Sequence, residues 1–231
     1  MLNASEITRV FDSTLKCEIS SQGFKLQKPR HWIRVDKTPI HEFVWLVSGR
    51  STYTVTWGVG LTFVPDVSLG KEIRLKYNRT EKSSRPDFDI GVMFIGNIPW
   101  KYQISTMSLP KLDTRSSWFG LKKEKRKLAT VADVSLVAKE GAVAALSAFE
   151  SIQSTSDVIS SVRKHYCKRP EILPCLYNYW LSLGLCEVAV GNEIQGFQMI
   201  DKFENDREEP VNQNDLHKFI EEARKIRGTL S

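Results

Sequence analysis

The segment Thr52-Tyr-Thr-Val-Thr-Trp-Gly-Val-Gly-Leu-Thr-Phe-Val64 decides the fold of this 231-residue chain. Its large apolar side chains occupy every second position, namely Tyr53, Val55, Trp57, Val59, Leu61 and Phe63. Threonine and glycine fill the positions between them. Because a strand turns successive side chains to opposite faces, this alternation predicts a strand with one apolar face. Burial of each such side chain contributes roughly 1.5–3 kcal/mol, so we expect this strand at the centre of the core.

Shorter segments near this strand alternate in the same way and predict an antiparallel sheet of about five strands. They span residues 32–36, 42–47, 88–94 and 100–104. The turn at residues 48–51 is short enough for a hairpin, so the strands on either side of it should be antiparallel neighbours. The polar and basic segment Val67–Pro86 interrupts the pattern, and we expect it to form a solvated excursion.

A helix is predicted ahead of the sheet, from Asn3 to Gln22. Apolar residues recur on one face of this segment at helical spacing. Asn3 and Glu6 have the spacing of a capping box, and Gly23 stands where a helix would end. The expected fold is therefore α+β, with an N-terminal helix packed on an antiparallel sheet and an all-helical C-terminal region.

The composition of the chain changes between residues 111 and 128. Serines and Gly120 are followed by five positive charges within Lys122–Lys127. From Ala129 onward, the spacing of the apolar residues becomes helical. We therefore expect a helix-plus-sheet domain over residues 1–110, a basic linker over residues 111–128 and a helical region over residues 129–231.

Part of the helical region resembles a tetratricopeptide repeat. Trp180 is followed by Leu183 and Gly184 at the spacing of that repeat, and the small residues Gly191 and Gly196 come later at suitable positions. The resemblance covers about 34 residues, which is one repeat. Because a single repeat cannot bury its own apolar face, it should dock on neighbouring helices.

The match to the repeat is partial. Glu187 stands where the repeat usually has an aromatic residue, and Phe203 replaces its late alanine. We expect a helical hairpin made of Pro170–Leu183 and Leu185–Phe203. A last amphipathic helix, Asp215–Arg227, is expected to cap this hairpin.

The N-terminal two thirds of the chain resemble the bacterial family called domain of unknown function 4304. The segments that carry the resemblance are Gly23-Phe24, Trp32-Ile-Arg-Val-Asp36, Tyr53-Thr-Val-Thr-Trp-Gly-Val-Gly60, Asp89-Ile-Gly-Val-Met-Phe-Ile95 and Trp100. It covers roughly residues 5–165, and its motifs are mainly core and turn residues. The resemblance implies an immunity protein or an interaction module and brings no catalytic residues with it.

Composition and residue spacing favour a protein without a metal or cofactor. The four cysteines form no CxxC pair, and no histidine lies at metal-ligand spacing from them. No apolar run approaches the roughly 18 residues of a membrane span, so we expect no membrane partner. The first residues lack the basic and apolar segments of a signal peptide, and a cytoplasmic location is therefore expected.

Basic residues supply the candidate contacts to a partner. The net charge is +6, and the first 120 residues hold 17 Lys and Arg against 11 Asp and Glu. The candidates for binding a protein or a nucleic acid are Lys122, Lys123, Lys125, Arg126, Lys127, Trp118, Arg163 and Lys164. Such runs can neutralise phosphates while a neighbouring aromatic side chain stacks on a base. A solvated linker is the other interpretation of the same basic run.

These observations lead to three hypotheses of function. The first is a non-enzymatic protein-binding module, which the family resemblance narrows to an immunity or accessory protein of a bacterial toxin or defence system. The second is a nucleic-acid-binding protein that uses the basic sheet half and the linker. The third is an enzyme of unknown class, for which no set of residues in the sequence provides a catalytic group.

Overall fold

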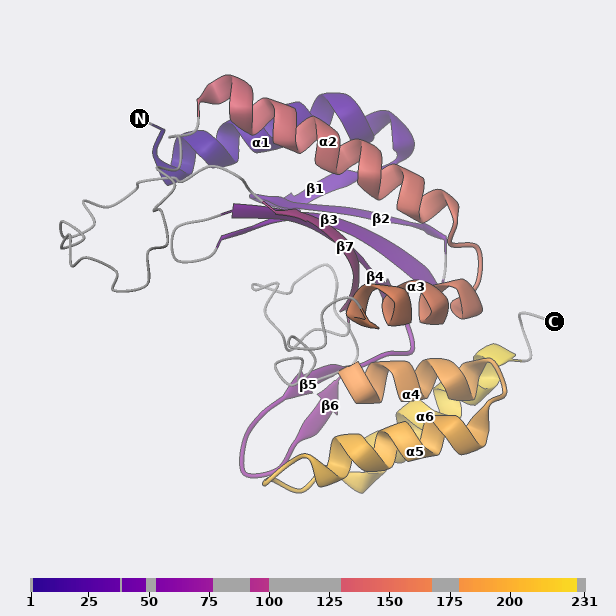
Figure 1. The fold of residues 1–231 in the computed structure, drawn as a ribbon. Coiled ribbons are helices and arrows are strands. Elements are labelled where there is room, and N and C mark those ends of the chain that lie inside the picture. The colour runs from indigo at the N-terminus through magenta and orange to yellow at the C-terminus, as the bar shows by residue number, and fades with distance from the viewer. Residues whose placement is uncertain are drawn as a thin grey trace, which may run out of the picture. The chain divides into compact units, whose positions relative to one another are not determined.

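The computed structural model describes residues 2–37, 39–48, 53–76, 92–99, 130–167 and 179–227. Its architecture is α+β, with an N-terminal helix, an antiparallel sheet and C-terminal helices, as the sequence predicts (Figure 1). Contacts divide the chain into two compact units. The first comprises residues 1–33, 44–57 and 97–146, and the second comprises residues 34–43, 58–96 and 147–231.

The main sheet has the strand order β1-β2-β3-β4-β7. These strands are β1 (Lys25–Lys28), β2 (His31–Lys37), β3 (Ile40–Ser48), β4 (Tyr53–Leu61) and β7 (Val92–Pro99). β1 and β2 pair antiparallel, and the register places Leu26 opposite Trp32 and shifts before Lys28. A second, two-stranded sheet pairs β5 (Asp66–Ser68) with β6 (Arg74–Lys76).

Strand β4 has the burial that its alternating sequence predicts. Val55, Val59 and Leu61 are fully buried, and Trp57 is 7% exposed. Thr54 is only half-buried. The alternation therefore identified the strand and its apolar face correctly.

Helices α1 (Ala4–Ile19) and α2 (Val131–Glu150) lie beside each other over this sheet (Figure 1). The Thr14 and Ser135 hydroxyls are hydrogen bonded at 2.9 Å. Gly141 of α2 packs against β4 so closely that a Cβ atom there would lie 2.5 Å from Val55 Cγ1. Real Cβ atoms do not approach this closely, so glycine lets the helix backbone contact the strand.

The N-terminal end of α1 is set by the residues that the sequence indicated, whereas Gly23 ends the 3-10 helix after α1. The Asn3 side chain accepts from the Glu6 amide at 2.9 Å, and Glu6 accepts from the Asn3 amide at 2.7 Å, which completes a capping box. A short 3-10 turn follows, and Gly23 ends it with a φ of 88°. That conformation favours glycine, and the chain then enters β1 through the buried Phe24.

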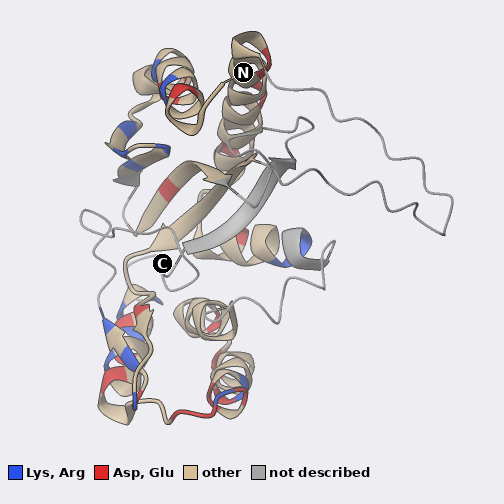
Figure 2. Cartoon of the chain, turned by 90° about the vertical axis from the view of Figure 1, so that its left-hand side faces the viewer, with Lys and Arg blue, Asp and Glu red and all other residues tan. Residues whose placement is uncertain are grey.

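The second unit contains four described helices that contact one another. Helix α3 (Thr155–Cys167) contacts α4 (Tyr179–Ala189), which packs against α5 (Glu193–Asn205) and α6 (Gln213–Arg227). Gly184 and Gly196 bring the backbones of α4 and α5 together, because a Cβ on Gly184 would lie 2.9 Å from the Gly196 carbonyl oxygen. Exposed acidic residues, among them Glu208 and Glu209, follow α5 (Figure 2).

The β5–β6 hairpin is attached to α6 within the second unit. The Asp215 carboxylate accepts from Arg74 Nε at 2.7 Å and from the Leu75 amide at 3.1 Å. Ile73 forms a parallel bridge to Val211, with backbone hydrogen bonds of 2.8 and 2.9 Å on either side. The hairpin thus pairs with a segment that lies more than 130 residues later in the chain.

Two expectations need correction, and one strand was missed. The described part of the expected excursion, residues 67–76, is not only solvated, since it contains part of β5 and all of β6. These two strands pair with each other, and the Asp215 side chain of α6 accepts hydrogen bonds from Arg74 and Leu75 of β6. The helical hairpin turns at residues 190–192, where Gly191 has a φ of 92°, rather than at Gly184 inside α4. Strand β1 was not predicted, because its four residues are too short and too polar to show alternation.

Other expectations fall outside the described residues. These are the strand over 100–104, the linker over 111–128 and most of the first helix of the expected hairpin, 170–178. Among the described helices, none combines the length and the hydropathy that crossing a bilayer requires.

Candidate functional site

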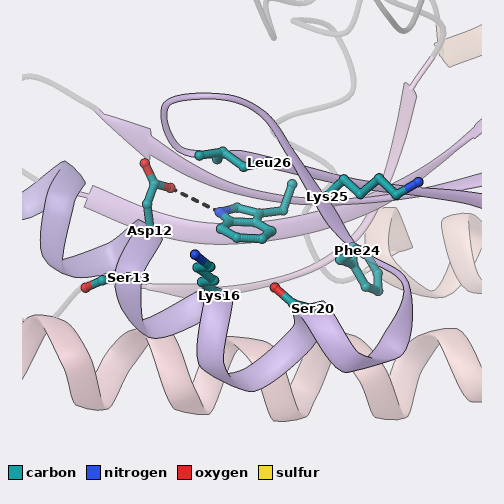
Figure 3. Close-up of a pocket in the computed structure, with 8 residues that line it drawn as sticks. Asp12, Ser13, Lys16, Ser20, Phe24, Lys25 and Leu26 are labelled. Atoms are coloured by element: carbon teal, nitrogen blue, oxygen red, sulfur yellow. Dashed lines mark hydrogen bonds between the residues drawn. The ribbon is translucent and has the colours of Figure 1, made fainter.

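A groove of about 570 Å³ lies between α1 and the β1–β2 hairpin, within the first unit (Figure 3). Its lining residues are Asp12, Ser13, Lys16, Ser20, Phe24, Lys25, Leu26 and Trp32. A volume of several hundred Å³ is typical of sites that bind a ligand or a side chain of a partner. The groove is therefore the candidate functional site.

Aromatic and aliphatic side chains form the floor and one wall of the groove. Phe24 and Trp32 are 2% and 3% exposed, whereas Leu26 is 46% exposed. Leu26 is the register partner of Trp32, so the two side chains lie on the same face of the sheet. The exposed Leu26 therefore offers an apolar surface that a partner can cover.

Asp12 holds this floor in place. Its Oδ1 atom accepts a hydrogen bond from Trp32 Nε1 at 3.0 Å, marked by the dashed line in Figure 3. Both carboxylate oxygens accept from the Arg30 amide at 3.1 Å. Burial raises the pKa of Asp12 above its usual value, while the bonds from Trp32 and Arg30 oppose the shift. With these donors in place, the carboxylate orients the indole and the β1–β2 turn.

Arg30 stabilises the same turn in an uncommon backbone conformation. Its φ is 71°, which costs free energy for a residue with a Cβ atom. Its Nε donates to the Thr8 hydroxyl at 2.6 Å, and its guanidinium lies 5.4 Å from the centre of the Tyr53 ring. These contacts, together with Asp12, hold the turn against α1 and make the groove a preformed feature.

Lys16 and Lys25 supply the positive charge of the groove. Both side chains are exposed, and no acidic group in the described part of the chain pairs with either of them. Figure 3 shows Asp12 and Lys16 reaching up from α1, with Leu26 on the strand across from them and Lys25 at the edge. The two lysines outweigh the one negative charge of Asp12 among the lining residues, so the net charge of the lining is positive.

His31 immediately precedes Trp32 in β2 and is buried. Its ring packs edge-on against Trp45, with the ring centres 6.3 Å apart. Burial, with the charges of Lys28 and Arg30, lowers the pKa of His31 to about 3. The ring is therefore neutral at pH 7 and acts as a core residue.

Of the residues predicted as partner contacts, the structure describes Arg163 and Lys164. Trp118 and the run Lys122–Lys127 lie outside the described residues. Arg163 donates to the buried Glu187 at 2.5 Å, and Asn192 Nδ2 donates to the other Glu187 oxygen at 2.8 Å. Arg163 thus joins α3 to α4 by an ion pair, whereas Lys164 is exposed on α3.

None of the groove residues was predicted from the sequence as a site residue. The signal that could have identified them is Leu26, an apolar residue between the charged or polar neighbours Lys25 and Gln27. That signal is weak, since single exposed leucines are common on protein surfaces. Within the described ranges, no group of three or more His, Cys, Asp or Glu side chains is arranged to hold a metal ion.

Comparison with known proteins gives no relative of this chain. No family model matches it, and neither does any curated protein or solved structure. The resemblance to domain of unknown function 4304 is therefore still an untested prediction.

Proposed function

We propose that this chain is a protein-binding module whose groove between α1 and β1 receives an apolar side chain of a partner. The observation that carries the proposal is the exposed Leu26 beside a buried floor of Phe24 and Trp32, held by the Asp12 carboxylate. Interface energy is concentrated in such preformed pockets that take one anchoring side chain.

The edge strand β1 supports insertion of a side chain rather than addition of a strand. β1 stands at the end of the sheet order and has four residues. It carries Lys25 and Lys28, and its register shifts between Leu26 and Lys28. Short length, lysines and an irregular register are the features by which edge strands avoid pairing with another chain. We therefore assign the binding to the groove beside β1.

The narrower form of the proposal is an immunity or accessory protein of a toxin or defence system. It rests on the family resemblance of residues 5–165, and its partner would be another protein. The second hypothesis, nucleic-acid binding, rests on the run Lys122–Lys127. It differs from the first hypothesis in predicting an affinity that falls steeply with salt concentration, because phosphates neutralised by the protein release counterions.

Selection from a random peptide library displayed on phage tests the proposal. The full chain and its Leu26→Ser variant serve as baits, and Ile194→Ser is the matched control, since Ile194 is 80% exposed on α5. We expect peptides that bind the unaltered chain and Ile194→Ser equally. They should bind Leu26→Ser about tenfold more weakly, because apolar burial at position 26 is lost.

Two outcomes of the same selection would contradict the proposal. The proposal is wrong if the library returns no peptide whose affinity depends on Leu26. It is also wrong if Leu26→Ser and Ile194→Ser weaken binding equally, because the effect then has no connection with the groove.

A further inference from the structure

We infer that the groove recognises an acidic segment of a partner protein, in which one apolar side chain is flanked by Asp or Glu residues. This inference rests on the proposed function and adds the chemistry of the ligand. The observations that carry it are the charges around the groove and the exposure of its lining residues.

The first step concerns the charge that a ligand meets. Asp12 is the one acidic side chain among the eight lining residues. Its oxygens accept from Trp32 Nε1 and from the Arg30 amide, and the Arg30 guanidinium adds a positive charge nearby. Lys16 and Lys25 are exposed at the groove without an acidic partner among the described residues. The mouth of the groove is therefore positive, and carboxylates complement it.

The second step concerns the apolar part of the ligand. Leu26 is the lining residue whose apolar surface is most exposed, at 46%. A leucine or aromatic side chain that covers it removes both apolar surfaces from water. Lys16 comes from α1 and Lys25 from β1, on the two sides of the groove. A chain with an apolar residue between two acidic ones therefore suits both features at once.

The third step distinguishes a peptide from a nucleic acid. Bases bind single-strand sites by stacking on exposed aromatic rings. Phe24 and Trp32 are only 2% and 3% exposed, and the Trp32 indole nitrogen is already bonded to Asp12. The aromatic rings of the groove are thus closed to stacking, while the aliphatic Leu26 remains open. An acidic peptide fits these conditions better than an oligonucleotide does.

The test uses the full chain and a set of synthetic heptapeptides. The first peptide has a central leucine flanked on each side by two glutamates, with glycine at both ends. The second replaces all glutamates with glutamine, the third replaces them with lysine, and the fourth replaces the leucine with serine. Binding is followed through the indole N–H resonance of Trp32 in a ¹⁵N-labelled sample, assigned with Trp32→Phe.

We expect the glutamate–leucine peptide to shift the Trp32 resonance and to bind about threefold to tenfold more tightly than the glutamine peptide, as exposed ion pairs allow. The lysine and serine peptides should bind more weakly still. The double variant Lys16→Gln/Lys25→Gln should remove the preference for glutamate over glutamine. The control Lys71→Gln, an exposed lysine of the second unit, should leave the preference unchanged.

The outcomes separate this inference from the function on which it rests. If the glutamine or lysine peptide binds as tightly as the glutamate peptide and shifts the same resonance, the inference of an acidic ligand is wrong. The groove is then still a peptide-binding site. If no peptide shifts the resonance, the proposed function fails as well. If a short oligothymidine shifts it and the peptides do not, the groove binds nucleic acid and both proposals are overturned.

Discussion

Asp12 of α1 accepts a hydrogen bond from the indole nitrogen of Trp32, its partner across the groove, at 3.0 Å. The same carboxylate accepts from the Arg30 amide, so one side chain joins the helix to both the turn and the following strand. A carboxylate in this position determines where the floor of the groove lies. Its contribution is open to direct measurement.

Asp12→Ala should lower the free energy of unfolding by about 1–3 kcal/mol, because the Trp32 indole nitrogen and the Arg30 amide lose their acceptor. Ser13→Ala is the matched control, since the neighbouring Ser13 is exposed and its hydroxyl only donates to a carbonyl of its own helix. Urea unfolding of the three proteins gives the comparison. Equal stabilities of Asp12→Ala and Ser13→Ala would show that Asp12 does not hold the hairpin.

The pKa of about 3 for His31 predicts a loss of stability in mild acid. The unfolded chain takes up a proton near pH 6.5, whereas the folded chain does not until about pH 3. Between these values the unfolded state holds more protons, so the free energy of unfolding falls as pH falls. The slope from this residue is at most about 1.4 kcal/mol per pH unit.

His31→Gln should remove this contribution, so that the stability of the variant varies less between pH 6.5 and pH 4.5 than that of the unaltered chain. His217→Gln is the control, because His217 is exposed on α6. Urea midpoints at three pH values provide the measurement. A His31→Gln profile parallel to that of the unaltered chain contradicts the buried, neutral histidine.

The contact between Gly184 and Gly196 predicts that α4 and α5 tolerate no larger residue there. A Cβ on Gly184 would lie 2.9 Å from both the Gly196 oxygen and Ile200 Cγ1. We expect Gly184→Ala to destabilise the chain by about 1–3 kcal/mol through overpacking, although alanine is the better helix former by roughly 1 kcal/mol.

Gly70→Ala is the control for this substitution, because a Cβ there would meet its nearest atom at an ordinary 3.5 Å. Thermal unfolding followed by circular dichroism gives the comparison. A Gly184→Ala variant that is as stable as Gly70→Ala would mean that the two helices can move apart without cost.

The hydrogen bonds of Asp215 predict that this residue holds the β5–β6 hairpin to α6. Replacing Asp215 with alanine removes the acceptor for Arg74 and for the Leu75 amide. We expect faster hydrogen exchange at the Leu75 amide, because it loses a partner outside its own hairpin. Asp201→Ala, an exposed acidic residue of α5, should leave that rate unchanged. Unchanged exchange in Asp215→Ala contradicts the attachment.

The local signals in the sequence determined α1 and β4. The Asn3–Glu6 capping box and Gly23 act on hydrogen bonds and dihedral angles within a few residues of themselves. The alternation from Tyr53 to Leu61 follows from the two-residue period of a strand. Such features depend on the neighbouring residues alone, so the sequence was sufficient to predict these elements and the α+β class.

Only the tertiary structure decided the position of β1, β6 and the helical turn at Gly191. Lys25–Lys28 becomes a strand because β2 offers hydrogen bonds to it. Residues 73–75 are held by Asp215, Pro210 and Asn212, far along the chain. Gly184 lies inside α4, where the close approach of Gly196 requires a residue without a Cβ atom. In the sequence, a glycine required for close packing cannot be distinguished from a glycine required for a turn.

The groove is also a feature that only the tertiary structure decided. Its residues come from α1, the turn after it and the β1–β2 hairpin, and nothing in the sequence indicated that they would form one site. Asp12 and Trp32 are twenty positions apart and meet only because α1 packs across the hairpin. The sequence by itself determined which residues prefer helix or strand, since those preferences are local. The site arose from burial and from hydrogen bonds between distant residues, which exist only once the chain has folded.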